Sequence, residues 1–90
     1  MNRTKYVHTK EHQVIVFGEA LSHDSFRHLN IVSAGFISFG VNSHGNPICR
    51  CYGESTSLGL NSDPGDTRVA MYDIIGCPYS EFDYEMEGVK

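Results

Sequence analysis

Short apolar runs along the chain predict strands. The longest uninterrupted run, from Val14 to Phe17, consists of β-branched and aromatic residues and predicts a strand over 12–17. Because this run is apolar on both faces, we expect the strand to lie in the middle of a sheet. Residues 1–11 before it are polar, and we expect them to be frayed at their start.

The clearest pairing of strands is a β-hairpin over residues 33–53, where polarity alternates on both sides of a cluster of turn formers. We expect a two-residue loop at His44-Gly45, because glycine tolerates a positive φ. This loop pairs Val41 with Ile48. The opposite face is then lined by small side chains, which are Ser38, Gly40, Cys49 and Cys51, with Phe36 near Gly53 at its end.

A helix is predicted over about 64–75, with its apolar stripe formed largely by Met71, Ile74 and Ile75. Asp63 is a suitable N-cap, and Asp66 places a carboxylate near the positive N-terminus. Gly76 is a natural residue to end the helix.

Two further segments give weaker patterns. Residues 18–30 fit either a short helical turn, capped by Ser22 or Asp24, or an extended loop. Residues 55–60 are expected to form a short strand with Leu58 and Leu60 directed inward.

Acidic and large apolar residues alternate over 81–87, and this period of two predicts a terminal strand. The strand fits an edge of the protein's own sheet, a strand added to another chain, or a row of carboxylates facing a basic partner. The candidate partner-binding residues are therefore Glu81, Phe82, Asp83, Tyr84, Glu85 and Met86.

Together these elements predict one α+β domain over residues 1–90. A small antiparallel sheet contains the hairpin at about 33–53, and the helix at about 64–75 packs on one of its faces. The composition, with 40% hydrophobic and 20% charged residues, is typical of a folded chain.

Charge and cysteine content narrow the class of protein. The net charge is −4, and the seven basic residues are scattered, so nothing predicts a nucleic-acid surface. No apolar run is long enough to span a membrane, and the N-terminus lacks the apolar core of a signal peptide. Three cysteines are an odd number, so we expect reduced thiols and a cytoplasmic location.

Three short segments match catalytic motifs in residue type but lack other features that these motifs need. Residues 8–12 match the H-x-x-E-H zinc motif, but they lead into a strand and lack a helical frame. Ser22-His23-Asp24 are neighbours, whereas catalytic triads assemble across space. Residues 53–59 are rich in hydroxyls and glycine but lack a phosphate-binding lysine. We therefore assign no catalytic residue and expect a protein that is not an enzyme.

The cysteines are the candidates for a metal site. Cys49 and Cys51 share one strand face, and a Cys₃His zinc site would add Cys77 and His44 or His28. Structural zinc commonly uses C-x₂-C, which wraps the ion, whereas C-x-C on a flat strand does not. We favour thiols that line a packed face, and we expect no cofactor.

The sequence predicts no specific activity. Its small size, acidic balance and alternating tail favour a protein-interaction or inhibitory accessory module, of the kind that phages and mobile elements encode. The expected partner is another protein or a second copy in a homodimer, which would add burial to a small chain. The alternative function is binding of a small ligand or of zinc through the cysteines and histidines.

Overall fold

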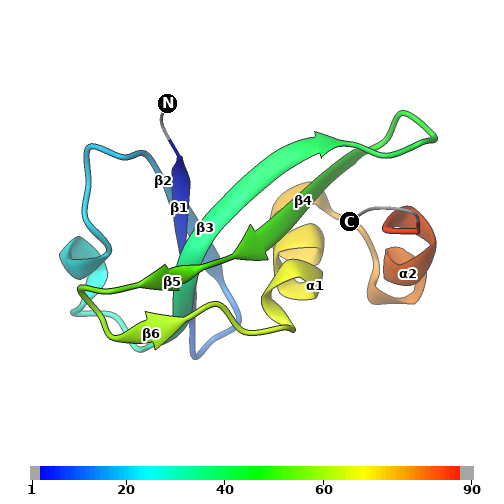
Figure 1. Ribbon diagram of the computed structural model, residues 1–90. Coiled ribbons are helices and arrows are strands. Elements are labelled where there is room, and N and C mark those ends of the chain that lie inside the picture. Colours follow the sequence, from blue (N-terminus) through cyan, green and yellow to red (C-terminus); the bar gives the residue numbers. More distant parts are fainter. Residues whose placement is uncertain (1–2, 88–90) are drawn as a thin grey trace.

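Four strands form an antiparallel sheet in the order β2-β1-β3-β4 (Figure 1). The computed structural model describes residues 3–87. The strands of this sheet are β1 (Thr4–Thr9), β2 (Val14–Phe17), β3 (Ile31–Val41) and β4 (Pro47–Tyr52). The predicted α+β class, with the hairpin and one helix on a sheet face, is confirmed.

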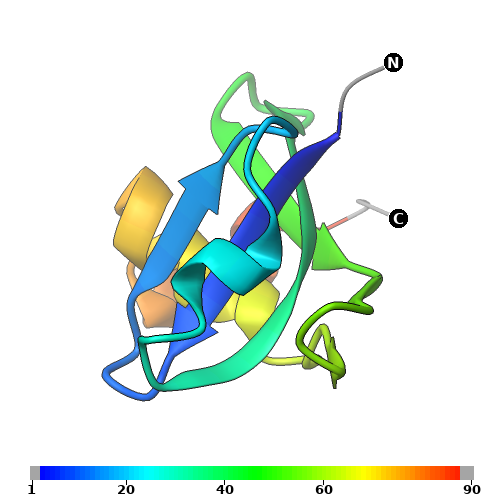
Figure 2. The ribbon, with the colours of Figure 1, turned by 90° about the vertical axis from the view of Figure 1, so that its left-hand side faces the viewer.

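The remaining elements are short. A second sheet pairs β5 (Glu54–Ser55) with β6 (Leu60–Asn61), and a 3₁₀ turn, η1 (His23–Phe26), lies between β2 and β3. The helical segments are α1 (Asp66–Ala70), a π-helical turn η2 (Met71–Ile75), a 3₁₀ turn η3 (Tyr79–Glu81) and α2 (Phe82–Glu85). Figure 2 shows η1 on one face of the main sheet and the α1–η2 helix on the other.

Much of the polar N-terminal segment forms a strand in the interior of the sheet, whereas the fraying expected at its very start falls on residues 1–2, outside the described residues. β1 pairs with β2 on one side and with β3 on the other. Tyr6 and Val7 are fully buried, at 0% exposure. The apolar run of 12–17, expected to be central, is instead the edge strand β2. Its two apolar faces are explained by contacts to cores on both sides of the sheet.

The hairpin between β3 and β4 has a different register from the predicted one. Val41 pairs with Pro47 and Phe39 with Cys49, which is a shift of one residue. The cause is Asn42, whose side-chain oxygen accepts hydrogen bonds from the backbone N–H groups of His44 and Asn46 at 2.9 and 3.0 Å. These bonds close a longer loop. The cysteines therefore share a face with Ile37 and Phe39, and the predicted face of small residues does not form.

The predicted helix over 64–75 is confirmed as α1 and η2 together. Asp63 shapes its start by accepting a hydrogen bond from Gly65 N–H at 2.8 Å, although Gly65 occupies the N-cap position. Gly76 ends the helix in the left-handed region, with φ of 88°.

The weaker predictions have mixed outcomes. Ser22 caps η1 by accepting a hydrogen bond from Asp24 N–H at 3.1 Å, which confirms the helical turn within 18–30. Residues 55–60 do not form one strand, because the chain turns between β5 and β6. Leu58 and Leu60 still pack against the cluster of Val7, Phe17 and Ala34.

The tail is helical, so the predicted terminal strand is wrong. Residues 79–85 form η3 and α2. Phe82 and Met86 are four residues apart and pack against the core beneath the sheet, whereas Tyr84 is 57% exposed. This core consists of Tyr6, Val14, Ile37, Ile48, Cys49, Ala70, Met71 and Cys77. A helical turn satisfies the same alternation by placing Phe82 and Met86 on one side.

Candidate functional site

A buried carboxylate lies where α1 meets the sheet. Asp66 is 1% exposed. Its Oδ1 atom accepts hydrogen bonds from His8 Nδ1 at 2.9 Å and from Ser33 Oγ at 2.8 Å. Its Oδ2 atom accepts hydrogen bonds from the Tyr6 hydroxyl at 2.5 Å and from Asp63 N–H at 3.0 Å. Each oxygen thus has two donors, which is what a buried carboxylate needs.

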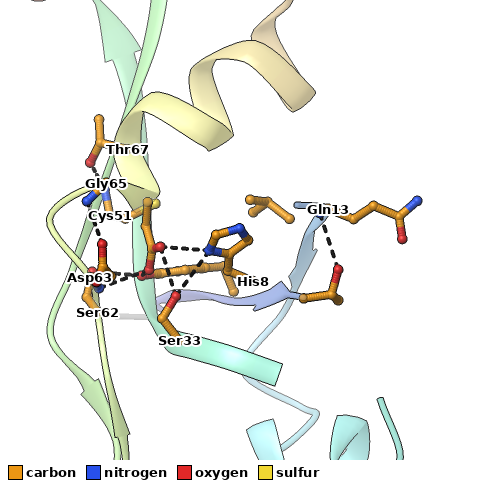
Figure 3. Close-up of polar contacts among 12 residues, drawn as sticks. His8, Gln13, Ser33, Cys51, Ser62, Asp63, Gly65 and Thr67 are labelled. Carbon is orange, nitrogen blue, oxygen red and sulfur yellow. Dashed lines mark hydrogen bonds and ion pairs between the residues drawn. The ribbon is translucent and has the colours of Figure 1, made fainter. Parts of the chain in front are cut away.

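The carboxylate and the side chains that donate to it come from three separate elements. Tyr6 and His8 lie on one face of β1, and Ser33 lies opposite His8 on β3. Figure 3 shows His8 and Ser33 pointing toward one another from these two strands. Asp66 stands in the first turn of α1. The carboxylate therefore fixes the helix to the centre of the sheet.

This group of residues contains Ser, His and Asp but does not form a nucleophilic relay. Both Ser33 and Asp66 contact the same imidazole nitrogen, Nδ1, at 3.2 and 2.9 Å. A relay needs the hydroxyl on one nitrogen and the carboxylate on the other. His8 Nε2 is buried and has no hydrogen-bond partner among residues 3–87. With Ser33 only 3% exposed, the cluster is a structural one.

Two thiols and a phenol titrate abnormally near this carboxylate. Burial raises the pKa of Cys49 to about 11. Burial, with Cys49 and Asp66 as further causes, raises the pKa of Cys51 to about 12. Burial and the hydrogen bond to Asp66 raise the pKa of Tyr6 far above its ordinary value. The raised pKa values favour the protonated thiols at neutral pH, so neither cysteine is activated as a nucleophile.

The cysteines pack into or against the core, although not on the predicted face of small residues. Cys49 and Cys77 belong to the core beneath the sheet, and Cys51 packs against it. His44 is exposed at the hairpin tip, where its ring stacks on Tyr84 at 4.9 Å. Within residues 3–87 the structure places no three His, Cys, Asp or Glu side chains as a metal-binding group.

The other short motifs are parts of turns. His8 lies in β1, one residue before its end, and His12 lies in the following turn with φ of 64°, so the H-x-x-E-H segment is not on a helix. Their rings are still 5.7 Å apart. The hydroxyl-rich segment 53–59 forms a local bend, where Ser55 Oγ accepts a hydrogen bond from Leu58 N–H at 3.3 Å.

Side chains from the helix bind the outer edges of the sheet. On β4, the N–H groups of Cys49 and Cys51 lie 3.2 Å from Met71 Sδ and 3.0 Å from Thr67 Oγ1. On β2, Val14 N–H donates to Asp73 Oδ2 at 3.0 Å. These contacts occupy backbone donors that would otherwise attract another strand.

Within residues 3–87, the sheet edge at residues 38–41 of β3 lacks such a cover. β1 pairs with β3 only as far as Ile37. Among residues 3–87, no strand pairs with the other side of residues 38–41. Phe39 is 50% exposed and Val41 is 69% exposed on this stretch. Figure 1 shows it within the hairpin arm that extends beyond the rest of the sheet.

The six predicted partner-binding residues of the tail have separate environments. Phe82 and Met86 pack against the core. Glu85 accepts hydrogen bonds from the Asn42 and Asn46 side chains of the hairpin. Asp83 lies 3.4 Å from Arg68, and Glu81 and Tyr84 are exposed. The network around Asp66 and the open edge at 38–41 were both missed, because long-range pairing decides both.

Comparison with known proteins does not assign this chain to a family. No protein-family model matches the chain, and searches of curated proteins and of solved structures find no match either. No helix in residues 3–87 is long and apolar enough to cross a membrane.

Proposed function

We propose that this chain is a protein-interaction module that binds an extended segment of another polypeptide along residues 38–41 of β3. Strand addition to an open sheet edge supplies affinity through main-chain hydrogen bonds, and neighbouring side chains supply specificity. The observation that carries the proposal is that, within residues 3–87, the stretch 38–41 has no partner, whereas other sheet edges are bound by Met71, Thr67 and Asp73.

The backbone of this stretch has the required orientation. Asn42 N–H donates to the Asn46 carbonyl at 2.9 Å, so these two residues form a hydrogen-bonded pair. Such pairs occur at every second residue of an antiparallel ladder, so residues 40 and 38 of β3 also direct their N–H and C=O groups toward β4. The N–H and C=O groups of Phe39 and Val41 are therefore directed away from β4. They are available to an added strand.

A hollow of about 230 Å³ adjoins the same stretch. Its lining is Ser38, Phe39, Gly40, Ile48, Cys49 and Arg50. Arg50 is exposed and forms no ion pair among residues 3–87. A side chain of the added strand fits such a hollow. An acidic side chain there would also form an ion pair with the Arg50 guanidinium.

The length of the stretch favours a peptide segment over a permanent dimer. Stable protein interfaces bury roughly 1,200 Å² or more, and a few residues of strand edge contribute far less than that. An extended peptide needs only such a short edge.

The test uses a displayed library of random, unstructured heptapeptides selected on the folded protein. Val41→Lys is expected to weaken the selected peptides at least about tenfold, because it adds a charge to the open edge. Val32→Lys is the matched control on the same strand, since Val32 is 51% exposed where β3 pairs with β1. Amide hydrogen exchange is then measured at Phe39 and Val41, with and without peptide.

The expected result is slower exchange of both amides with peptide bound. Equal loss of binding in the two variants, or unchanged exchange at Phe39 and Val41, contradicts the proposal. Slower exchange that depends on protein concentration without any peptide shows that a second copy occupies the edge instead.

A further inference from the structure

A second recess lies between the end of η2, the tail helix and the hairpin tip. Its volume is about 200 Å³. Apolar side chains form much of its lining, and two carboxylates contribute to it. The residues that matter here are Pro47, Met71, Ile75, Cys77, Glu81 and Glu85.

The two carboxylates both come from the tail and line the same recess. Glu81 and Glu85 are four residues apart across η3 and α2, a spacing that brings like charges together on one side of a helix. Glu85 is held in place, because the amide nitrogens of Asn42 and Asn46 lie 2.6 and 3.2 Å from its Oε2 atom. The hairpin tip thus fixes one acid beside the recess.

No cation of the described chain offsets this pair. Among residues 3–87, the basic side chain nearest in sequence is Arg68, which lies 3.4 Å from Asp83 and donates to the Tyr79 carbonyl at 3.3 Å. Glu81 forms no ion pair or side-chain hydrogen bond among residues 3–87. Burial, and then the charges of Glu85 and Glu81, raise the pKa of the Cys77 thiol. The carboxylates therefore act on the interior of the recess.

We propose that this recess binds the basic side chain of a partner protein, a lysine or an arginine. The aliphatic part of such a side chain would lie on Met71 and Ile75, and its cationic head would lie between Glu81 and Glu85. Charge complementarity selects this occupant, because an acidic or neutral side chain would leave the carboxylate pair uncompensated. The recess is separate from the edge at residues 38–41 and does not depend on the proposed strand addition.

The test is a titration of the isotope-labelled protein, followed by NMR, with three blocked amino acids. N-acetyl-lysine N-methylamide is the probe. The corresponding norleucine and glutamate derivatives are the neutral and acidic controls. The lysine derivative is expected to shift the amide signals of Ile75, Cys77 and Glu81. Glu81→Gln should weaken its affinity about threefold to fivefold, and Glu81→Lys should abolish measurable binding.

Glu19→Gln is the matched control, because it removes the same charge from an exposed position outside the recess. It should leave the affinity for the lysine derivative unchanged. Equal binding of the norleucine derivative would overturn the proposal, as would equal weakening by Glu81→Gln and Glu19→Gln. Val41→Lys, which targets the strand edge, should not affect this titration, so the two proposals can fail separately.

Discussion

At the scale of single residues, Asp66 has a larger role than its position in the sequence indicates. A carboxylate just after Asp63-Pro64 is expected to stabilise the start of a helix, and the bond to Asp63 N–H fits that role. In the folded protein the same side chain is also the acceptor for Tyr6, His8 and Ser33. A helix-start residue has become the polar centre of the core.

Asp66→Asn tests this role with almost no change in volume. One oxygen becomes an amide nitrogen that faces donors, so hydrogen bonds are lost and at least one buried donor is left unpaired. We expect the free energy of unfolding to fall by about 3 kcal/mol. Urea denaturation followed by circular dichroism measures it. Asp63→Asn, at an exposed position where Asn also caps, should cost less than about 1 kcal/mol. Equal losses would contradict the central role of Asp66.

At the scale of elements, local signals predicted what local chemistry controls. The helix at 64–75 was predictable because Asp63, Pro64 and Gly76 determine its ends within a few residues. β1 was not predictable, since His8 is polar in the sequence and is buried only through a partner 58 residues away. The hairpin register depended on one side chain, Asn42, that bonds the loop backbone.

The site was less predictable than the fold. Among residues 3–87 the edge at 38–41 is unpaired because β1 begins at Thr4, opposite Ile37, and nothing in residues 38–41 reveals how far another strand extends. For the tail, the local pattern was visible in the sequence but did not decide the structure. Its alternating pattern fits both a strand and a helix, and the contacts of Phe82 and Met86 with the core decide between them.

The helical tail leads to a prediction that a strand would not make. Phe82→Ala is expected to lower the free energy of unfolding by about 2 kcal/mol, because its ring packs on the core and lies 4.6 Å below the Arg68 guanidinium. Tyr84→Ala should cost less than about 1 kcal/mol, because Tyr84 is largely exposed. A strand would place both rings on one face, so equal losses in thermal or urea unfolding would contradict the helix.

At the scale of the whole molecule, three protonated groups lie beneath the sheet and link stability to alkaline pH. Cys49 and Cys51 have pKa values raised from 9.0 to about 11 and about 12, and the pKa of Tyr6 is raised further. Raised pKa values mean that the folded state retains protons that the unfolded chain releases first. The contribution of these groups to the free energy of unfolding is therefore fully present below about pH 9 and decreases as the pH rises above that value.

We expect the free energy of unfolding, measured in urea with a reducing agent, to decline from pH 9 upward. Each group contributes up to about 1.4 kcal/mol per pH unit, and Tyr6 adds its share above about pH 10. Cys51→Ser should make the decline shallower, because one titrating group is removed. Tyr72→Phe, at an exposed phenol, should leave the profile unchanged. A flat profile between pH 9 and 11 would show that these thiols are not buried as described.

The bonds to Asp66 also impose an order on folding. They close loops of 60 residues to Tyr6 and 58 residues to His8. During synthesis β1 is made early, yet two of its buried polar side chains meet their acceptor only after Asp66 has left the ribosome. The first strand of the chain is thus among the last to reach its final environment. A nascent chain halted before Asp66 has its central strand but lacks the charge that holds it.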